Sequence, residues 1–295
     1  MVYTLLAYLM WGFFPAFFPL LLPAGPLEIL AHRLVWCALF MVIVLLLIRG
    51  WGELRRAGLR EWGWLALAGV LISVNWGIYV LAVNSGHVAD AALGYFINPL
   101  LSIALGMLFL GERLRRWQIV SVVIAAVGVI WLTFLTGQPP YLAIGLALSF
   151  GFYGLIKKRV TVSAAASLTA EALTMTPVAI IYLVWLASRG ESTFTSEGPG
   201  HTALLLLAGV VTAAPLFFFG AGAKQIPLAT VGMLQYITPT MQMLWALFVT
   251  HEYLSASRWI GYIIIWVAVA VYLADLLTSR RGRKQTPPTY SPDAA

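Results

Sequence analysis

Charged residues are scarce in this chain of 295 residues, and their scarcity excludes a soluble protein. Lysine, arginine, aspartate and glutamate together make up 10% of the sequence, whereas hydrophobic residues make up 61% and the mean hydropathy is +0.89. A water-soluble domain of this size needs a much larger charged surface to stay in solution. The composition therefore predicts an integral membrane protein, with membrane lipid as its surrounding partner.

Cysteine and catalytic motifs are also nearly absent. The single cysteine, Cys37, lies in an apolar run, so one chain cannot form a disulfide or a thiolate metal site. The sequence has no Gly-x-x-x-x-Gly-Lys-Ser/Thr loop for phosphates, no His-Glu-x-x-His motif and no clustered metal ligands. We therefore expect no enzyme activity, no cofactor and no metal. Nucleic acid is not expected as a partner either, because the positions of the basic residues explain the net charge of +7.

Long apolar runs are what the sequence does contain. A helix needs roughly 20 apolar residues to cross about 30 Å of hydrocarbon, and ten such runs can be placed. They lie near residues 3–22, 27–48, 62–84, 88–110, 116–135, 141–156, 167–187, 202–224, 226–249 and 257–277. Because backbone polar groups in lipid must be satisfied within each segment, these runs predict an all-α integral membrane protein with ten transmembrane helices.

The basic residues predict which way the chain crosses the membrane. They gather in the loops on one side and in the C-terminal tail: Arg49, Arg55, Arg56, Arg60, Arg113, Arg115, Arg116, Lys157, Lys158, Arg159, Lys224, Arg280, Arg281, Arg283 and Lys284. The loops on the other side carry Arg189 and Arg258. By the positive-inside rule, both termini are expected to be cytoplasmic.

One motif occurs twice, 140 residues apart. Phe96-Ile97-Asn98-Pro99 is followed by Glu112, and Tyr236-Ile237-Thr238-Pro239 is followed by Glu252, with thirteen residues from proline to glutamate in both copies. Both glutamates are expected to accept amide hydrogen bonds at the start of the helix that follows. Since each half holds five helices, an odd number, the second half must be inverted relative to the first, as in many membrane carriers.

The repeat divides the chain into three parts. Residues 1–137 form the first five-helix repeat and residues 138–278 form the second, inverted repeat. Residues 279–295 form a basic tail with three prolines and no apolar run, and we expect this tail to be disordered in the cytoplasm.

Polar and aromatic side chains at mid-membrane depth are candidates for a substrate cavity, since burying an amide in hydrocarbon without a partner costs several kcal/mol. The candidates are Trp11, Trp36, Asn75, Trp76, Tyr79, Tyr95, Asn98, Tyr153, Gln235 and Tyr236. Pro99 and Pro239 free the carbonyls of Tyr95 and Gln235, and we expect this pair to act as hinges in a cavity wall. The alternative is that the aromatic residues pack or anchor at the interface and the prolines only kink their helices.

Four ionisable residues set inside helices are candidates for gating or proton coupling: Glu28, His32, Arg33 and Glu171. Glu28 and His32 are spaced i,i+4 and share one helix face. A shift of 139 residues places Glu171 opposite His32 in the other half. The alternative is that these groups interact with helix dipoles or extend toward headgroups.

Several stretches resemble RarD-type members of the EamA group in the drug/metabolite transporter superfamily. They are Trp11-Gly12, Glu28-Ile29-Leu30-x-His32-Arg33, Asn75-Trp76, Gly94-Tyr95-Phe96-Ile97-Asn98-Pro99, Leu110-Gly111-Glu112-Arg113, Phe152-Tyr153-Gly154 and Gln235-Tyr236-x-x-Pro239. The resemblance implies ten helices in two inverted halves and a cavity mainly from the third, fourth, eighth and ninth helices. It also implies permease activity in the bacterial inner membrane.

The expected function is secondary transport of a small polar or amphipathic metabolite or drug, by alternating access around a central cavity, with export favoured. A lipid flippase or a non-transporting membrane sensor is the alternative. The residues leave the substrate, the coupling ion and the oligomeric state open.

Overall fold

The computed structural model describes residues 1–85, 87–136, 140–251 and 253–284, and every regular element in this part of the chain is a helix. The elements are α1 (Val2–Gly12), α2 (Phe14–Phe17), the 3-10 helix η1 (Phe18–Leu21), α3 (Pro26–Leu47), α4 (Trp51–Arg56), α5 (Leu59–Asn84), α6 (Val88–Leu110), α7 (Arg116–Thr136), α8 (Tyr141–Arg159), α9 (Ala164–Ser188), α10 (Gly198–Ala223), α11 (Leu228–Gln235), α12 (Ile237–Phe248) and α13 (Ala256–Lys284). The expected all-α fold class is confirmed for these residues.

Eight segments are long and apolar enough to cross a membrane. They are α1 together with α2 and η1, then α3, α5, α6, α7, α9, α10 and α13. The two other expected spans are α8, which carries three basic residues in its last turn, and the pair α11 and α12, which Tyr236 separates. A multi-pass helical membrane protein is therefore confirmed, and the count of ten spans stays a prediction.

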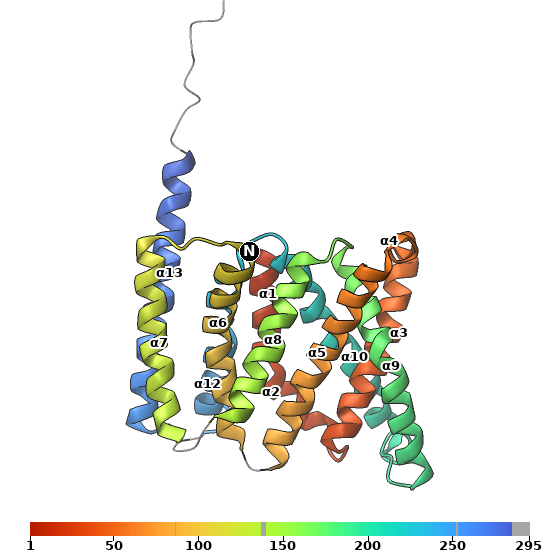
Figure 1. The fold of residues 1–295 in the computed structure, drawn as a ribbon. Helices are drawn as coiled ribbons and strands as arrows, with labels where there is room; N and C mark the ends of the chain where they lie inside the picture. The colour runs from red at the N-terminus through yellow and green to blue at the C-terminus, as the bar shows by residue number, and fades with distance from the viewer. Residues whose placement is uncertain (86, 137–139, 252, 285–295) are drawn as a thin grey trace, which may run out of the picture.

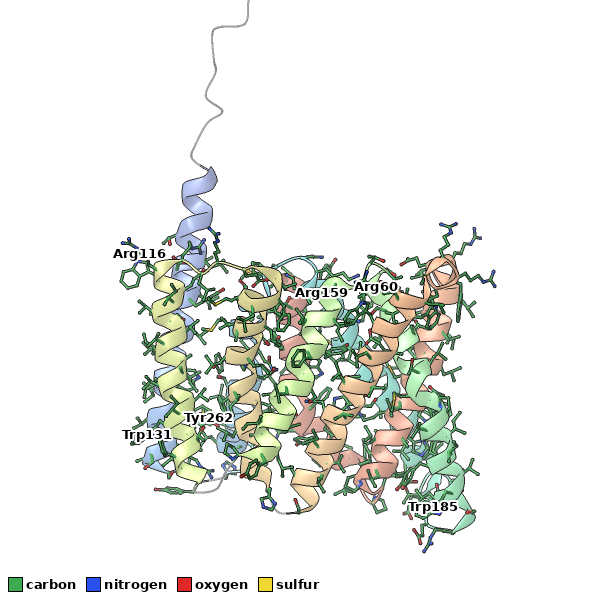
Figure 2. The ribbon with its side chains drawn as sticks, viewed as in Figure 1. Arg60, Arg116, Trp131, Arg159, Trp185 and Tyr262 are labelled. Carbon is green, nitrogen blue, oxygen red and sulfur yellow. The ribbon has the colours of Figure 1, made fainter. Side chains whose placement is uncertain are left out.

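The helices run side by side between two faces, and the molecule is basic at one of them. The N-terminus and the end of α13 lie toward the same face (Figure 1). Arg60, Arg116 and Arg159 extend there, whereas Trp131 and Trp185 lie near the opposite face (Figure 2). We call these the basic face and the opposite face. Their contrast follows the separation of charge that the sequence predicts between the two sets of loops.

The larger packing contacts recur between helices that the predicted repeat makes equivalent. α1 packs on α10 as α8 packs on α5, α3 packs on α10 as α9 packs on α5, and α12 packs on α1 as α6 packs on α8. Three pairs join corresponding helices directly, namely α3 with α9, α6 with α11, and α7 with α13. The last pair forms one edge of the molecule (Figure 1).

The end of the chain differs from the sequence prediction. α13 continues to Lys284, so residues 279–284, which were expected to be disordered, are helical and extend beyond the other helices (Figure 1). Residues 285–295, Glu252 and the expected junction at residues 137 and 138 lie outside the described residues.

Gly209 sets how closely α10 approaches α3. A Cβ atom at this position would lie 2.4 Å from the carbonyl carbon of Trp36 and 2.6 Å from the nitrogen of Cys37, both backbone atoms of α3. Gly209→Ala should therefore destabilise the fold by about 1–3 kcal/mol, seen as a lower apparent melting temperature in detergent.

Gly63→Ala is the matched control, because nothing lies within 4 Å of a Cβ added at that helical glycine. It should leave stability unchanged or raise it by up to about 1 kcal/mol. Equal melting temperatures for the two alanine variants would contradict the close packing of α3 against α10.

Candidate functional site

The two repeated motifs meet at the centre of the molecule. The Asn98 side-chain amide in α6 donates a 2.9 Å hydrogen bond to Oε1 of Gln235, the last residue of α11. The Tyr236 hydroxyl donates to the Phe96 carbonyl at 3.2 Å, and the two rings stack with centroids 6.3 Å apart. Phe96 and Tyr236 occupy equivalent positions in the two copies of the motif, 140 residues apart. The sequence repeat therefore corresponds to a direct contact between the halves.

Both expected hinge prolines are buried beside this contact. The Pro99 carbonyl oxygen lies 2.7 Å from where a Cβ atom of Gly232 would be, so α11 crosses α6 closely at the proline. Pro239 lies in the first turn of α12 and lacks the amide that would bond the Gln235 carbonyl. This missing hydrogen bond explains why the helix divides at Tyr236.

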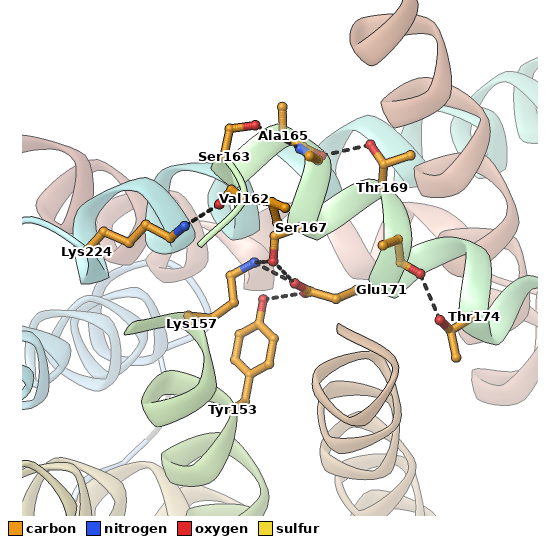
Figure 3. Close-up of polar contacts among 12 residues, drawn as sticks. Tyr153, Lys157, Val162, Ser163, Ala165, Ser167, Thr169, Glu171, Thr174 and Lys224 are labelled. Atoms are coloured by element: carbon orange, nitrogen blue, oxygen red, sulfur yellow. Dashed lines mark hydrogen bonds and ion pairs between the residues drawn. The ribbon is translucent and has the colours of Figure 1, made fainter. Parts of the chain in front are cut away.

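A buried ion pair lies toward the basic face. The Lys157 ammonium in α8 donates to Oε1 of Glu171 in α9 at 2.6 Å, and both side chains are at most 1% exposed. Lys157 also donates to the Ser167 hydroxyl at 2.8 Å, and the Tyr153 hydroxyl donates to Oε2 of Glu171 at 3.1 Å (Figure 3). The Ser167 hydroxyl in turn donates to Oε1 of Glu171 at 2.5 Å, so the carboxylate has three donors and a full counter-charge.

Other basic side chains form hydrogen bonds to backbone carbonyls at the same face. Lys224 donates to the Val162 carbonyl (Figure 3), and Lys158 donates to the Ile226 carbonyl at 2.6 Å. Burial lowers the pKa of Lys224 from its ordinary value, and the nearby positive charge of Lys157 lowers it further. Loss of a proton is thus easier for this lysine than for one in water.

Glu28, in the first turn of α3, holds the loop between α9 and α10 at the opposite face. Its Oε1 accepts hydrogen bonds from the Thr193 amide at 2.7 Å and from the Ser192 hydroxyl at 3.0 Å, and its Oε2 accepts from the Thr193 hydroxyl at 3.0 Å. Glu28 is 2% exposed. One carboxylate therefore fastens the first half to a loop of the second.

His32 and Trp36 extend this cluster by one and two helical turns. The Trp36 indole donates to Nδ1 of His32 at 3.0 Å, and the imidazole stacks on Phe194 with ring centroids 4.7 Å apart. Nε2 of His32 is buried 3.9 Å from the Glu28 carboxylate and has no hydrogen-bond partner among the described residues. The i,i+4 spacing does bring Glu28 and His32 together, although not to hydrogen-bonding distance.

Arg33 has a different environment from the other predicted gating residues. Its Nε donates to the Thr212 hydroxyl in α10 at 2.9 Å, and its guanidinium carbon lies 4.3 Å from the Trp76 ring centroid. The Phe18 ring is 5.0 Å away. The residue is 9% exposed, and no ion pair among the described residues includes it.

A small cavity lies between the two polar clusters. Its volume is about 10 Å³, roughly enough for one water molecule, and α3, α5, α9 and α10 line it. Trp76, Glu171 and Ser73 are among its lining residues, and the buried Ser73 hydroxyl has no partner among the described residues. The resemblance implied a cavity formed mainly by α5, α6, α10 and the pair α11 and α12. This small cavity shares α5 and α10 with that expectation, whereas α3 and α9 form the rest of its wall. At this volume the centre is closed to an organic solute.

The remaining candidates for the substrate cavity are engaged elsewhere. The Asn75 amide bonds the Leu146 carbonyl at 2.8 Å and the Ser149 hydroxyl at 3.0 Å, which ties α5 to α8. Trp11 packs edge-on against Phe150. Tyr79 and Tyr95 lie with ring centroids 6.1 Å apart.

Sequence reasoning missed three of the polar partners. Lys157 was assigned to a loop because it begins a run of basic residues, and only its 0% exposure reveals its role. Thr193 lies in the loop between α9 and α10 and belongs to no motif of the sequence. Glu112 does accept amide hydrogen bonds, but from Leu228 and Ala229 at the start of α11, at 2.6 and 2.9 Å, and not from the helix that follows it. Within the described ranges no cluster of His, Cys, Asp or Glu could hold a metal ion.

A model of the EamA-like transporter family matches this chain twice, over residues 1–134 and 140–274. Protein RarD of Streptomyces exfoliatus is 46% identical over 286 residues, covering 96% of this chain and 91% of that protein. The uncharacterized transporter YojE of Bacillus subtilis is 46% identical over 290 residues, 96% of each chain. The chloramphenicol-sensitive protein RarD of Pseudomonas aeruginosa is 30% identical over 277 residues, 92% of this chain and 91% of that protein.

One solved crystal structure is similar in fold. Its TM-score is 0.70 at 18% sequence identity, and the alignment covers 92% of this chain and 95% of the other. At this identity the likeness concerns the arrangement of the helices and nothing finer.

The buried ion pair gives a stability prediction. Lys157→Met leaves the Glu171 carboxylate buried without its cation and should cost about 3–5 kcal/mol of stability, measured as a fall in apparent melting temperature in detergent. Combining Lys157→Met with Glu171→Gln removes both charges and should recover most of the loss. Arg55→Met is the control, since that side chain is exposed and forms no ion pair with any described residue. A double variant no more stable than the single one would refute the pairing.

The Glu28 contact predicts a change in loop exchange. Glu28→Ala removes the acceptor of the Thr193 amide, so peptides that cover residues 190–197 should take up deuterium faster. Glu191→Ala is the control, because that carboxylate is half exposed and pairs only with Arg189 among the described residues. If both variants exchange as the unmodified protein does, Glu28 does not hold the loop.

Proposed function

The chain belongs to the EamA-like transporter family, and we propose that it is a secondary carrier that moves a small polar or amphipathic metabolite or drug across the bacterial inner membrane. The proposal has one principal support. Two polar clusters close opposite ends of the same helix group, Glu28 with Thr193 at one end and Glu171 with Lys157 at the other, with a small cavity between them.

The proposal includes ten spans in two inverted halves. The recurrence of the larger helix contacts between corresponding helices supports this, and so do the two separate family matches on either side of residues 135–139. α8 then corresponds to α1, and α11 with α12 corresponds to α6. Inverted halves of this kind can rock around a site at their interface and open it to each side in turn.

The basic face is cytoplasmic in this proposal. Arg60, Arg116 and Arg159 at that face agree with the positive-inside rule, and both ends of the described chain lie toward it. The Lys157 and Glu171 pair then forms the inner gate, and Glu28 with the loop between α9 and α10 forms the outer gate. Export corresponds to loading through the inner gate and release through the outer one.

Protonation of Glu171 is the proposed coupling step. A proton on Glu171 neutralises the carboxylate that holds Lys157 at 2.6 Å, which weakens the link between α8 and α9. The inner end of the helix group can then open while Glu28 keeps the outer end closed. Loss of the proton restores the ion pair and closes the inner end. The outer end is then held more weakly than the inner end, because Glu28 has no complementary charge at hydrogen-bonding distance.

The test is transport by the purified protein in proteoliposomes, with a labelled metabolite panel that includes amino acids, and with and without an imposed pH gradient. Chloramphenicol belongs in the panel because the Pseudomonas aeruginosa relative is named a chloramphenicol-sensitive protein. We expect one solute class to accumulate against its gradient only when the pH gradient is present.

Glu171→Gln should abolish the accumulation that the pH gradient drives, because a neutral amide cannot exchange the coupling proton. Glu191→Gln, an exposed carboxylate near the opposite face, should transport normally. Normal accumulation by Glu171→Gln would refute proton coupling at this gate. No movement of any solute, together with movement of labelled lipid between leaflets, would favour a flippase.

A further inference from the structure

Arg33 carries a buried positive charge that no residue of the described chain neutralises. It lies about 10 Å along α3 from the first residue of that helix, between the two polar clusters. The neighbouring carboxylates are already engaged, Glu171 by Lys157 and Glu28 by Thr193. An isolated charge at this depth in a membrane protein is costly unless an anion or water accompanies it.

The donors of Arg33 are arranged for a ligand. Nε is used by the Thr212 hydroxyl at 2.9 Å, whereas the two terminal nitrogens make no hydrogen bond to any residue that the structure describes. Part of this side chain remains accessible, since the residue is 9% exposed. A guanidinium with free terminal donors matches the two oxygens of a carboxylate.

The surroundings of the guanidinium are aromatic. Its carbon lies 4.3 Å from the Trp76 ring centroid, 5.0 Å from that of Phe18 and 5.9 Å from that of Phe14. Tyr79 and Tyr95 lie with ring centroids 6.1 Å apart, and neither hydroxyl bonds another described residue. The rings around the guanidinium offer an apolar wall for the body of a ligand.

We propose that Arg33 is the substrate-binding cation of the carrier and that the transported solute is an organic monocarboxylate with an apolar or aromatic body. This inference rests on the proposed transport function and narrows its substrate class. One guanidinium is neutralised by one carboxylate. A dianion such as a phosphate monoester would bring an unpaired negative charge into a low dielectric, since the next cation, Lys157, is already paired.

Matched probes test the inference on the full chain in lipid nanodiscs. Phenylacetate, phenylacetamide and phenyl phosphate share one ring and differ in the group that meets Arg33. Calorimetric titration should show phenylacetate binding on the order of ten- to a hundredfold more tightly than phenylacetamide, as expected for hydrogen bonds to charged groups. Equal binding of acid and amide, or tighter binding of phenyl phosphate, would overturn the proposal.

Variants assign the effect to Arg33. Arg33→Gln should lose the preference for the acid over the amide, and Arg33→Lys should retain part of it, because lysine keeps the charge but lacks the planar pair of donors. Arg189→Gln is the matched control, since Arg189 also lies over a tryptophan but is exposed at the loop and pairs with Glu191. If Arg33→Gln keeps the preference, the site is elsewhere.

The acid and amide comparison on the unmodified protein needs no variant to fold, so the test stands if Arg33→Gln is unstable. Transport assays separate the two proposals. Proteoliposomes that move neutral solutes but neither bind nor move carboxylates would overturn the substrate class and leave the carrier function standing. Proteoliposomes that move no solute at all would overturn the carrier function itself.

Discussion

Polar groups inside hydrocarbon must find partners within the protein, and this constraint decides where the helices are held together. Most of the buried polar contacts join residues of the first half to residues of the second. Asn98 bonds Gln235, Asn75 bonds Ser149, and Arg33 bonds Thr212. Helices in lipid gain little from apolar contact with one another, so these few hydrogen bonds and the close approaches at small residues fix the interface.

The two ends of the helix group are closed by different chemistry. Toward the basic face, a fully buried ammonium and carboxylate depend on each other, because either charge alone would be costly. Toward the opposite face, Glu28 receives neutral donors from one loop, and His32 lies nearby without a hydrogen bond to it. A single proton therefore changes the first end more than the second. Arg33 lies between them with the only unpaired positive charge that we find in the interior of the described residues, which is where a carrier needs to attract a solute.

The sequence was sufficient to predict features that depend on a periodic or repeated pattern of residues. The apolar runs predicted helices, the recurrence of Ile-Asn-Pro and Ile-Thr-Pro predicted paired segments, and Asn98 and Gln235 are indeed in contact. Residues whose importance comes only from tertiary burial were not found. Lys157 belongs to a basic run that resembles a loop, and no local pattern distinguishes it from Lys158. Thr193 donates to Glu28 through both its backbone amide and its hydroxyl, but a threonine in a polar loop gives no sequence pattern that identifies its partner. Pro99 in α6 and Pro239 in α12 led us to expect a cavity wall at this level, and α11 packs closely against α6 at Gly232, so the cavity wall stays a prediction.

The central claim is that the two ends of the helix group open in alternation, and distances between spin labels test it most directly. One pair, Leu27→Cys with Ser196→Cys, reports on the Glu28 end, and a second pair, Arg60→Cys with Arg159→Cys, reports on the basic face. The native Cys37 is buried and should remain unlabelled. In nanodiscs at acidic and alkaline pH, with and without a transported solute, the account predicts that one distance lengthens as the other shortens. Distances that lengthen together, or that stay fixed in every condition, would contradict alternating access.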